Sequence, residues 1–451
     1  MSLEKYEPGE LILDDELNCC FPEHGLIHEY LWWVRQTTDA PPWWSLGAIL
    51  SCLAHEAARH GFRIDQRQMI KPSLWVAILG PSSIGKSTAM ARAADFYKTY
   101  LEIEDATDPF VHAEGTIPGI FERLVEMPTY GDDELHAAIL YQDEFSRLLD
   151  QRDTVAEMLM KMADGHVIDR NLVRVHEKRR QGEGSYSRLE HHAISAMFAT
   201  THSNLRRVIK GHHIEGGLLS RMLWFIAKAP KEFMLHPSLL PAKRAVALAA
   251  WTDWSGWLLA QSVESGSRVV QISDEVDAIL EATLFEDWVQ TAATDDRLNP
   301  TRRRAIGQAY TVAGLYALSC RRTSINSDDM DQAVNLIERC IRDLENWEPE
   351  LATSDIMAAV NKGFRQIVRA GDAGLGRSKL YQALRAPKAI IDQVLQTLID
   401  EGSIREDRAK ANGRPGRPAI RYIANGRHRF CGESAEPDRA AKVVQLPSRK
   451  A

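Results

Sequence analysis

Residues 72–97 read PSLWVAILGPSSIGKSTAMARAADFY, and this stretch decides the fold. The apolar run from Leu74 to Leu79 is typical of a buried strand, and the alanine-rich segment after Ser87 has helical character. The residues between them, GPSSIGKS, match the pattern GxxxxGK[ST]. Because this motif requires the order strand, loop, helix, we read it as a phosphate-binding loop rather than a plain glycine-rich turn. The sequence therefore predicts an α/β fold with a P-loop core.

The residue types of this loop suit a nucleoside triphosphate. Gly80 and Gly85 let the backbone turn tightly, so that N–H groups and the following helix N-terminus converge on phosphate oxygens. We expect Lys86 to reach the β- and γ-phosphates and the Ser87 hydroxyl to ligate Mg²⁺, with ATP as the nucleotide. The predicted binding loop comprises Gly80, Pro81, Ser82, Ser83, Ile84, Gly85, Lys86, Ser87 and Thr88.

A second half of the site is expected in AAILYQDEFSRLL, residues 137–149. An apolar strand ends there at the acidic pair Asp143 and Glu144. Such a pair is often only a solvated strand end. Behind a buried strand and downstream of a phosphate loop, we expect Asp143 to hold Mg²⁺ and Glu144 to polarise the attacking water.

A third apolar strand, within HAISAMFATTHSNL (residues 192–205), ends in Thr200, Thr201 and Asn204. Polar side chains at this edge are placed to contact the γ-phosphate or to position water, and the spacing does not choose among them. We include Thr201 in the predicted catalytic set.

Residues 214–226, IEGGLLSRMLWFI, set Arg221 in an apolar run. A buried guanidinium is costly unless an anion pairs with it. Arg221 therefore either has a carboxylate partner inside this chain or points out of the fold at an anion.

The order of these segments resembles that of AAA+ ATPases. Residues from about 40 to 235 are similar to a family of P-loop ATPases carried by phages, plasmids and integrated elements, often described as primase-associated or helicase-like. The similar segments are GPSSIGKST, YQDEFSRLL, ATTHSN and GGLLSRMLW. LLSR also resembles a segment of minichromosome-maintenance helicases, which implies that Arg221 is an arginine finger on a neighbouring subunit's nucleotide. The resemblance further implies a homo-oligomer, expected to be a hexameric ring, and a primase or other replication protein as a possible partner.

Residues 163–193 separate the acidic pair from the third strand. Strand-like alternation from Val167 to Val175, the turn QGEGS and a returning segment predict a β-hairpin with Lys178, Arg179 and Arg180 near its tip. In ring helicases a hairpin at this place enters the central channel, where basic groups contact nucleic-acid backbone. The alternative is a solvated charged turn.

Helical segments flank the core on both sides. We expect a helical N-terminal region at 1–66, the ATPase core at 67–235 and a helical lid at 236–347. The tryptophans of the N-terminal region are expected to pack in the core rather than to stack on bases. Arg302, Arg303 and Arg304 open one lid helix and either contact nucleotide or lie on the surface.

Residues 348–425 form a separate segment, followed by a flexible tail at 426–451. Three helical stretches and two strand-like stretches joined by ANGRPGRP predict a winged helix. Lys388 on its third helix, with Arg414 and Arg417 on its wing, are the expected DNA contacts. Winged helices also dock proteins, which is the alternative.

Bulk properties agree with a soluble, multidomain ATPase. The chain has 451 residues, 44% of them hydrophobic, and a net charge of -7. No segment looks like a signal peptide or a membrane span, and six scattered cysteines suggest reduced thiols, so we expect a cytoplasmic protein with no membrane partner. We predict a ring-forming motor acting on single-stranded or duplex DNA, a replicative helicase of a mobile genetic element. The alternatives are an ATP-dependent DNA-binding switch without unwinding activity and a protein-remodelling ATPase.

Overall fold

The chain divides into two compact units, Met1–Leu351 and Ala352–Ala451, and each is described by itself. The computed structural model describes residues 15–65, 69–113, 117–131, 134–151, 153–172, 185–209, 217–227, 240–264, 268–274, 276, 299–347, 355–384, 388–400, 403–408 and 420–424. Within this described part, no helix is both long and apolar enough to cross a bilayer.

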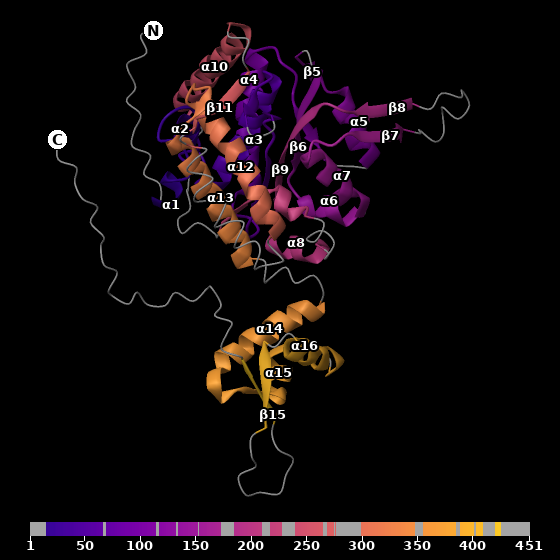
Figure 1. The fold of residues 1–451 in the computed structure, drawn as a ribbon. Coiled ribbons are helices and arrows are strands. Elements are labelled where there is room, and N and C mark those ends of the chain that lie inside the picture. Colours follow the sequence, from indigo (N-terminus) through magenta and orange to yellow (C-terminus); the bar gives the residue numbers. More distant parts are fainter. Residues whose placement is uncertain are drawn as a thin grey trace, which may run out of the picture. The chain divides into compact units, whose positions relative to one another are not determined.

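A mostly parallel sheet forms the centre of the first unit (Figure 1). Its strands are β3 (Trp75–Leu79), β4 (Phe110–His112), β5 (Thr129–Tyr130), β6 (Leu135–Gln142), β9 (His192–Thr200) and β10 (Leu223–Ile226). The order is β10-β3-β9-β6-β4 with all neighbours parallel, while β5 pairs antiparallel with β6. This α/β arrangement with five parallel strands is consistent with the predicted P-loop core.

Helices cover both faces of this sheet, as expected for parallel strands that are apolar on both sides. The helices of the first unit are α1 (Asp15–Asn18), α2 (Leu26–Val34), α3 (Pro42–Arg59), α4 (Lys86–Ile103), α5 (Ile117–Glu126), α6 (Phe145–Gln151), α7 (Asp153–Ala163), α8 (His202–Val208), α10 (Pro241–Glu264), α12 (Asn299–Ser319) and α13 (Ser327–Trp347). Val76 and Ile78 of β3 pack in one core with α2, α3, α4, α10, α12 and α13. Trp75, Ala77 and Leu79 pack on the opposite face with α5, α6, α7 and α8.

The N-terminal tryptophans belong to this core. Trp32, Trp33, Trp43 and Trp44 are all at least 94% buried, because each has a relative exposure of 6% or less. The packing interpretation of these residues is therefore confirmed.

A buried carboxylate ties the helices of the first unit together. Glu56 of α3 is fully buried and accepts hydrogen bonds from Tyr97 (2.5 Å) and Tyr100 (2.8 Å) of α4 and from Ser255 (2.7 Å) of α10. Burial alone would raise the pKa of Glu56, but His60 and the charge of Arg59 outweigh it and hold that pKa well below its usual range. Removing one partner from such a buried network typically costs about 3–5 kcal/mol.

Two smaller sheets complete the first unit. One has the order β12-β11-β1-β2, from β1 (Arg63–Asp65), β2 (Met69–Ile70), β11 (Val269–Ile272) and β12 (Ser324–Ile325). The other is the antiparallel pair of β7 (Ile168–Leu172) and β8 (Ser185–Leu189), which confirms the predicted hairpin over its described residues. Lys178, Arg179 and Arg180 lie outside the described residues.

The second unit packs three helices against a small antiparallel sheet. Its elements are α14 (Asp355–Ala370), η4 (Gly371–Ala373), β13 (Leu375–Gly376), α15 (Arg377–Leu384), α16 (Lys388–Asp400), β14 (Ile404–Arg408) and β15 (Ile420–Ala424). The sheet order is β13-β15-β14. Ile391, Val394, Leu395 and Leu398 of α16 are buried in the core of this unit.

Two buried histidines predict that the protein loses stability in mild acid. Burial lowers the pKa of both His55 and His192 to about 4, from 6.5. Because the unfolded chain binds these protons first, the free energy of unfolding should fall as the pH drops from 6.5 towards 4. The slope should approach about 1.4 kcal/mol per pH unit for each histidine.

Denaturant unfolding at several pH values measures this slope. His192→Asn should reduce it, whereas the same change at the exposed neighbour His191 should not. Equal slopes for the two variants would contradict the assignment.

Candidate functional site

The phosphate loop joins the carboxyl end of β3 to the first turn of α4. Its two glycines are required by the packing around them. A Cβ on Gly80 would lie 2.4 Å from the ring of Trp44 and 3.0 Å from the carbonyl oxygen of Ala227. Gly85, the N-cap of α4, has φ 91°, a left-handed conformation that favours glycine. The loop backbone is therefore held against α3, and only glycine fits at these two positions.

Lys86 is fixed over this loop. Its ammonium donates to the carbonyl oxygens of Gly80 (3.2 Å) and Pro81 (2.5 Å), and the residue is only 8% exposed. Burial lowers the pKa of Lys86, while the charges of Glu144 and Asp143 act in the opposite direction. The remaining loop residues present an open surface, because Pro81, Ser82, Ser83, Ser87 and Thr88 are exposed, whereas Ile84 is buried.

The acidic pair lies beside the loop, although β9 separates the strands that carry them. The Ser87 hydroxyl donates to Oδ1 of Asp143 at 2.7 Å. A hydroxyl and a carboxylate at this distance are the oxygen donors that Mg²⁺ takes together with phosphate oxygens and water, so these residues fit the predicted metal. Both β3 and β6 run parallel to β9, which lies between them, so their carboxyl ends reach the same edge of the sheet.

Glu144 is held by three side chains. Its Oε1 accepts from Ser146 (2.5 Å) and Thr200 (2.7 Å), and its Oε2 accepts from Asn204 Nδ2 (3.1 Å). Burial tends to raise the pKa of Glu144, but these hydrogen bonds outweigh it and lower that pKa. Glu144 is thus an oriented, ionised carboxylate at the edge where the loop lies.

The polar residues that follow β9 divide into two roles. Thr200 and Asn204 contact Glu144, whereas Thr201 is the N-cap of α8 and its Oγ1 accepts from the backbone N–H of Asn204 at 3.2 Å. Sequence reasoning named Thr200 and Asn204 but did not find Ser146. Its position two residues after Glu144, at the start of a helix, was the available signal.

Arg221 lies at the opposite edge of the sheet. It ends the 3-10 turn η2 (Leu219–Arg221), just before β10, and β10 aligns Leu223 with Val76 of β3. At ~3.3 Å per residue, Arg221 is therefore about 20 Å from the phosphate loop along the strand, farther than an arginine side chain reaches.

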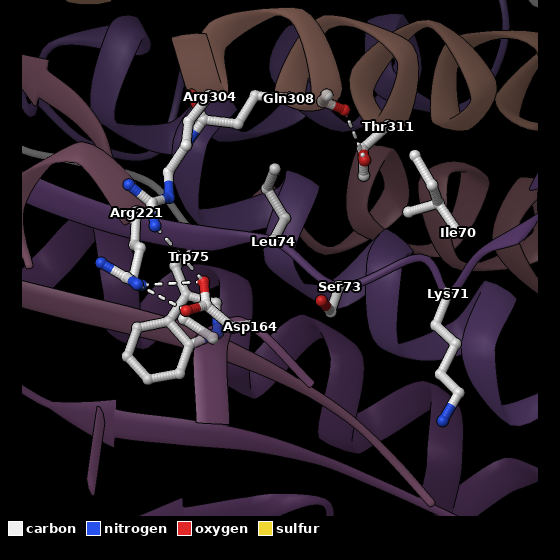
Figure 2. Close-up of a pocket in the computed structure, with 12 residues that line it drawn as sticks. Ile70, Lys71, Ser73, Leu74, Trp75, Asp164, Arg221, Arg304, Gln308 and Thr311 are labelled. Carbon is white, nitrogen blue, oxygen red and sulfur yellow. Dashed lines mark hydrogen bonds and ion pairs between the residues drawn. The ribbon is translucent and has the colours of Figure 1, made fainter. Parts of the chain in front are cut away.

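In this single chain, Arg221 has an internal carboxylate partner. Its Nε donates to Oδ1 of Asp164 at 2.8 Å and its Nη2 to Oδ2 at 2.5 Å (Figure 2). Its Nη1 donates to the carbonyl oxygen of Gly217 at 2.7 Å. Of the two alternatives for Arg221, a carboxylate partner inside this chain is therefore the one found in this structure. Asp164 was not found from the sequence, because nothing local links it to a residue so distant along the chain.

The other basic residues are distributed as follows. Arg302 pairs with Glu345, Arg303 is exposed, and Arg304 lies in the same cavity as Arg221. Lys388 is exposed at the start of α16. The predicted DNA contacts Arg414 and Arg417 lie outside the described residues.

Comparisons with known proteins add little to this geometry. No family model matches the chain, and no curated protein matches it. One similar solved structure is described as "SCCmec type IV Cch - active helicase". It is 13% identical, covers 93% of this chain and 74% of its own, and has a TM-score of 0.38.

The contact of Gly80 with Trp44 predicts a specific effect on nucleotide binding. Gly80→Ala must displace the Trp44 ring or the loop, an overpacking that costs about 1–3 kcal/mol. If the loop moves, affinity for ATP falls about tenfold for each 1.4 kcal/mol. Gly256→Ala in α10 is the matched control, because a Cβ there has no neighbour within 4 Å. Titration with a fluorescent ATP analogue and thermal unfolding measure both variants, and unchanged affinity together with unchanged stability in Gly80→Ala would contradict the steric account.

Proposed function

We propose that this chain is an ATP-hydrolysing motor that acts on DNA as a ring of identical subunits, and that it serves a mobile genetic element as a replicative helicase. The observation that carries the proposal is the convergence of Lys86 and Ser87 with Asp143 and Glu144 at one edge of a parallel sheet. A phosphate loop and an oriented acidic pair are the two parts that nucleotide hydrolysis needs.

Each of these residues has a distinct part in the proposed reaction. Lys86 neutralises charge on the β- and γ-phosphates, and Ser87 and Asp143 hold Mg²⁺. When bound, Mg²⁺ neutralises phosphate charge and stabilises the leaving diphosphate. Glu144 orients a water in line with the γ-phosphate and accepts its proton, so that inorganic phosphate and ADP leave. Thr200 and Asn204 keep Glu144 ionised and aimed at this water.

Arg221 supports action across a subunit boundary. It lies about 20 Å from its own phosphate loop by the strand rise, so any nucleotide that it contacts belongs to another copy. Although Arg221 pairs with Asp164 within this chain, we propose that in the ring its guanidinium also reaches the γ-phosphate of the neighbouring subunit, as an arginine finger does. Thr201 caps α8 and so keeps Asn204 beside Glu144, a supporting part in the same site.

The remaining segments have proposed parts on the DNA. Residues 1–66 would serve as an N-terminal region, residues 236–347 as a lid and residues 348–425 as a winged helix. Lys388, Arg414 and Arg417 would contact duplex backbone or grooves, while the hairpin residues Lys178, Arg179 and Arg180 would contact the strand inside the ring. Such contacts are mainly electrostatic and salt-sensitive.

The proposal predicts ATP turnover that rises with single-stranded DNA and displacement of one strand from a forked duplex. Glu144→Gln keeps the shape of the site but removes the base, so turnover should fall about 10²–10⁴-fold. Nucleotide binding should remain. If DNA stimulates ATP turnover but no strand is displaced, the result would favour the DNA-binding switch. If ATP turnover does not respond to DNA, the result would favour a protein remodeller.

Mixing two inactive variants tests whether Arg221 acts in trans. Arg221→Ala should lower turnover about 10³–10⁵-fold, and Lys86→Ala should abolish nucleotide binding. A mixture of the two variants should regain turnover, because some interfaces then combine an intact loop with an intact arginine. No regained activity in rings shown to contain both variants would overturn action in trans.

A further inference from the structure

Among the described residues that line a cavity of about 220 Å³ at the amino-terminal edge of the central sheet, Asp164 is the only carboxylate (Figure 2). Besides its two hydrogen bonds with Arg221, its Oδ1 lies 3.8 Å from Nη2 of Arg304. Nη1 of Arg304 also donates to the Ser220 hydroxyl at 3.1 Å. The carboxylate therefore lies between two guanidinium groups and contacts both.

Positive charges outnumber negative ones among the described residues that line this cavity. Lys71, Arg221 and Arg304 each carry one positive charge, and Asp164 carries one negative charge. Burial and the charge of Arg221 lower the pKa of Arg304, while Asp164 acts in the opposite direction. Without Asp164 the two partly buried cations would repel each other, and Arg221 would leave its present position. With it, the two guanidinium groups stay together.

Within the described part of the chain, the charge of Asp164 has no partner other than these two arginines. It follows the last residue of α7, and its backbone N–H still donates to the carbonyl oxygen of Met160 at 3.0 Å. Gly165, with φ 67°, ends the helix immediately afterwards. A carboxylate at a helix C-terminus is electrostatically unfavourable, so the arginines, and not the helix, stabilise it there.

We propose that Asp164 is a positioning residue that sets the direction of the Arg221 guanidinium towards the nucleotide of the neighbouring subunit. The inference rests on the proposed function, in which Arg221 acts in trans. Asp164 touches no nucleotide itself. It fixes Arg221 through two parallel hydrogen bonds, with the Gly217 carbonyl as a third support, and it screens Arg221 from Arg304.

Asp164→Asn tests this role in the full-length ring. The turnover number should fall about 10²-fold, the loss typical of a catalytic group displaced by about 1 Å, while the KM for ATP stays unchanged. A mixture of Asp164→Asn with Lys86→Ala subunits should regain turnover, because the defect lies in what one subunit offers to the next. The same substitution should add nothing to Arg221→Ala.

Glu157→Gln is the matched control, because it also removes a carboxylate. Glu157 lies in α7, the helix that Asp164 follows, and it pairs with Lys161 rather than with either arginine. It should keep wild-type turnover. Asp164→Glu keeps the charge but moves it, so its turnover should fall between that of wild type and Asp164→Asn. Wild-type turnover in Asp164→Glu would overturn the proposal, and this variant decides it if Asp164→Asn does not assemble.

The outcomes separate this inference from the proposed function. If Arg221→Ala and Lys86→Ala do not complement each other, the site in trans fails, and the role of Asp164 fails with it. If that pair regains turnover but the mixture of Asp164→Asn with Lys86→Ala does not, only the positioning role is overturned.

Discussion

The parallel register of β3, β9 and β6 is the constraint on which the rest of the candidate site depends. Leu79 pairs with Thr200, and Gln142 pairs with Phe198, so the three strands end almost level. The residues just beyond these ends therefore meet at one edge, although they come from separate parts of the chain. The hydrogen bond between Ser87 and Asp143 is a consequence of this register. A shift of one strand by one residue would turn its side chains to the other face and separate the pair.

The same register gives the unit two chemically different edges. The carboxyl edge carries the phosphate loop and an excess of acidic and hydroxyl groups, whereas the amino edge carries Arg221, Arg304 and Lys71. Since the strand length separates these edges, one chain alone cannot bring the arginine to its own loop. In the proposed ring, a head-to-tail arrangement of copies would join one edge to the other, because such contacts close into rings when the rotation allows it.

The parts of this site that could be predicted from the sequence are those that short runs of neighbouring residues determine. The loop from Gly80 to Ser87 and the acidic pair after β6 depend on neighbouring residues, and so does the alternation that indicated the β7–β8 hairpin. The partners of Glu56 come from α4 and α10, and Asp164 meets Arg221 from another helix. Such pairs depend on how distant elements pack, and no spacing along the chain encodes them. The sequence placed Thr200 and Asn204 near the end of a strand, but it did not show that they contact Glu144. These contacts depend on how the end of β9 and the start of α8 lie beside β6.

The Glu56 network has a consequence for how the gene can be divided. The donors to this carboxylate come from α3, α4 and α10, so its hydrogen bonds connect three separate segments of the first unit. A fragment cut before α10 would lack Ser255, and one begun after α3 would leave Tyr97 and Tyr100 without their acceptor. Neither piece retains a complete interior. Helices α3, α4 and α10 therefore have to be present together for the buried carboxylate of Glu56 to keep its partners.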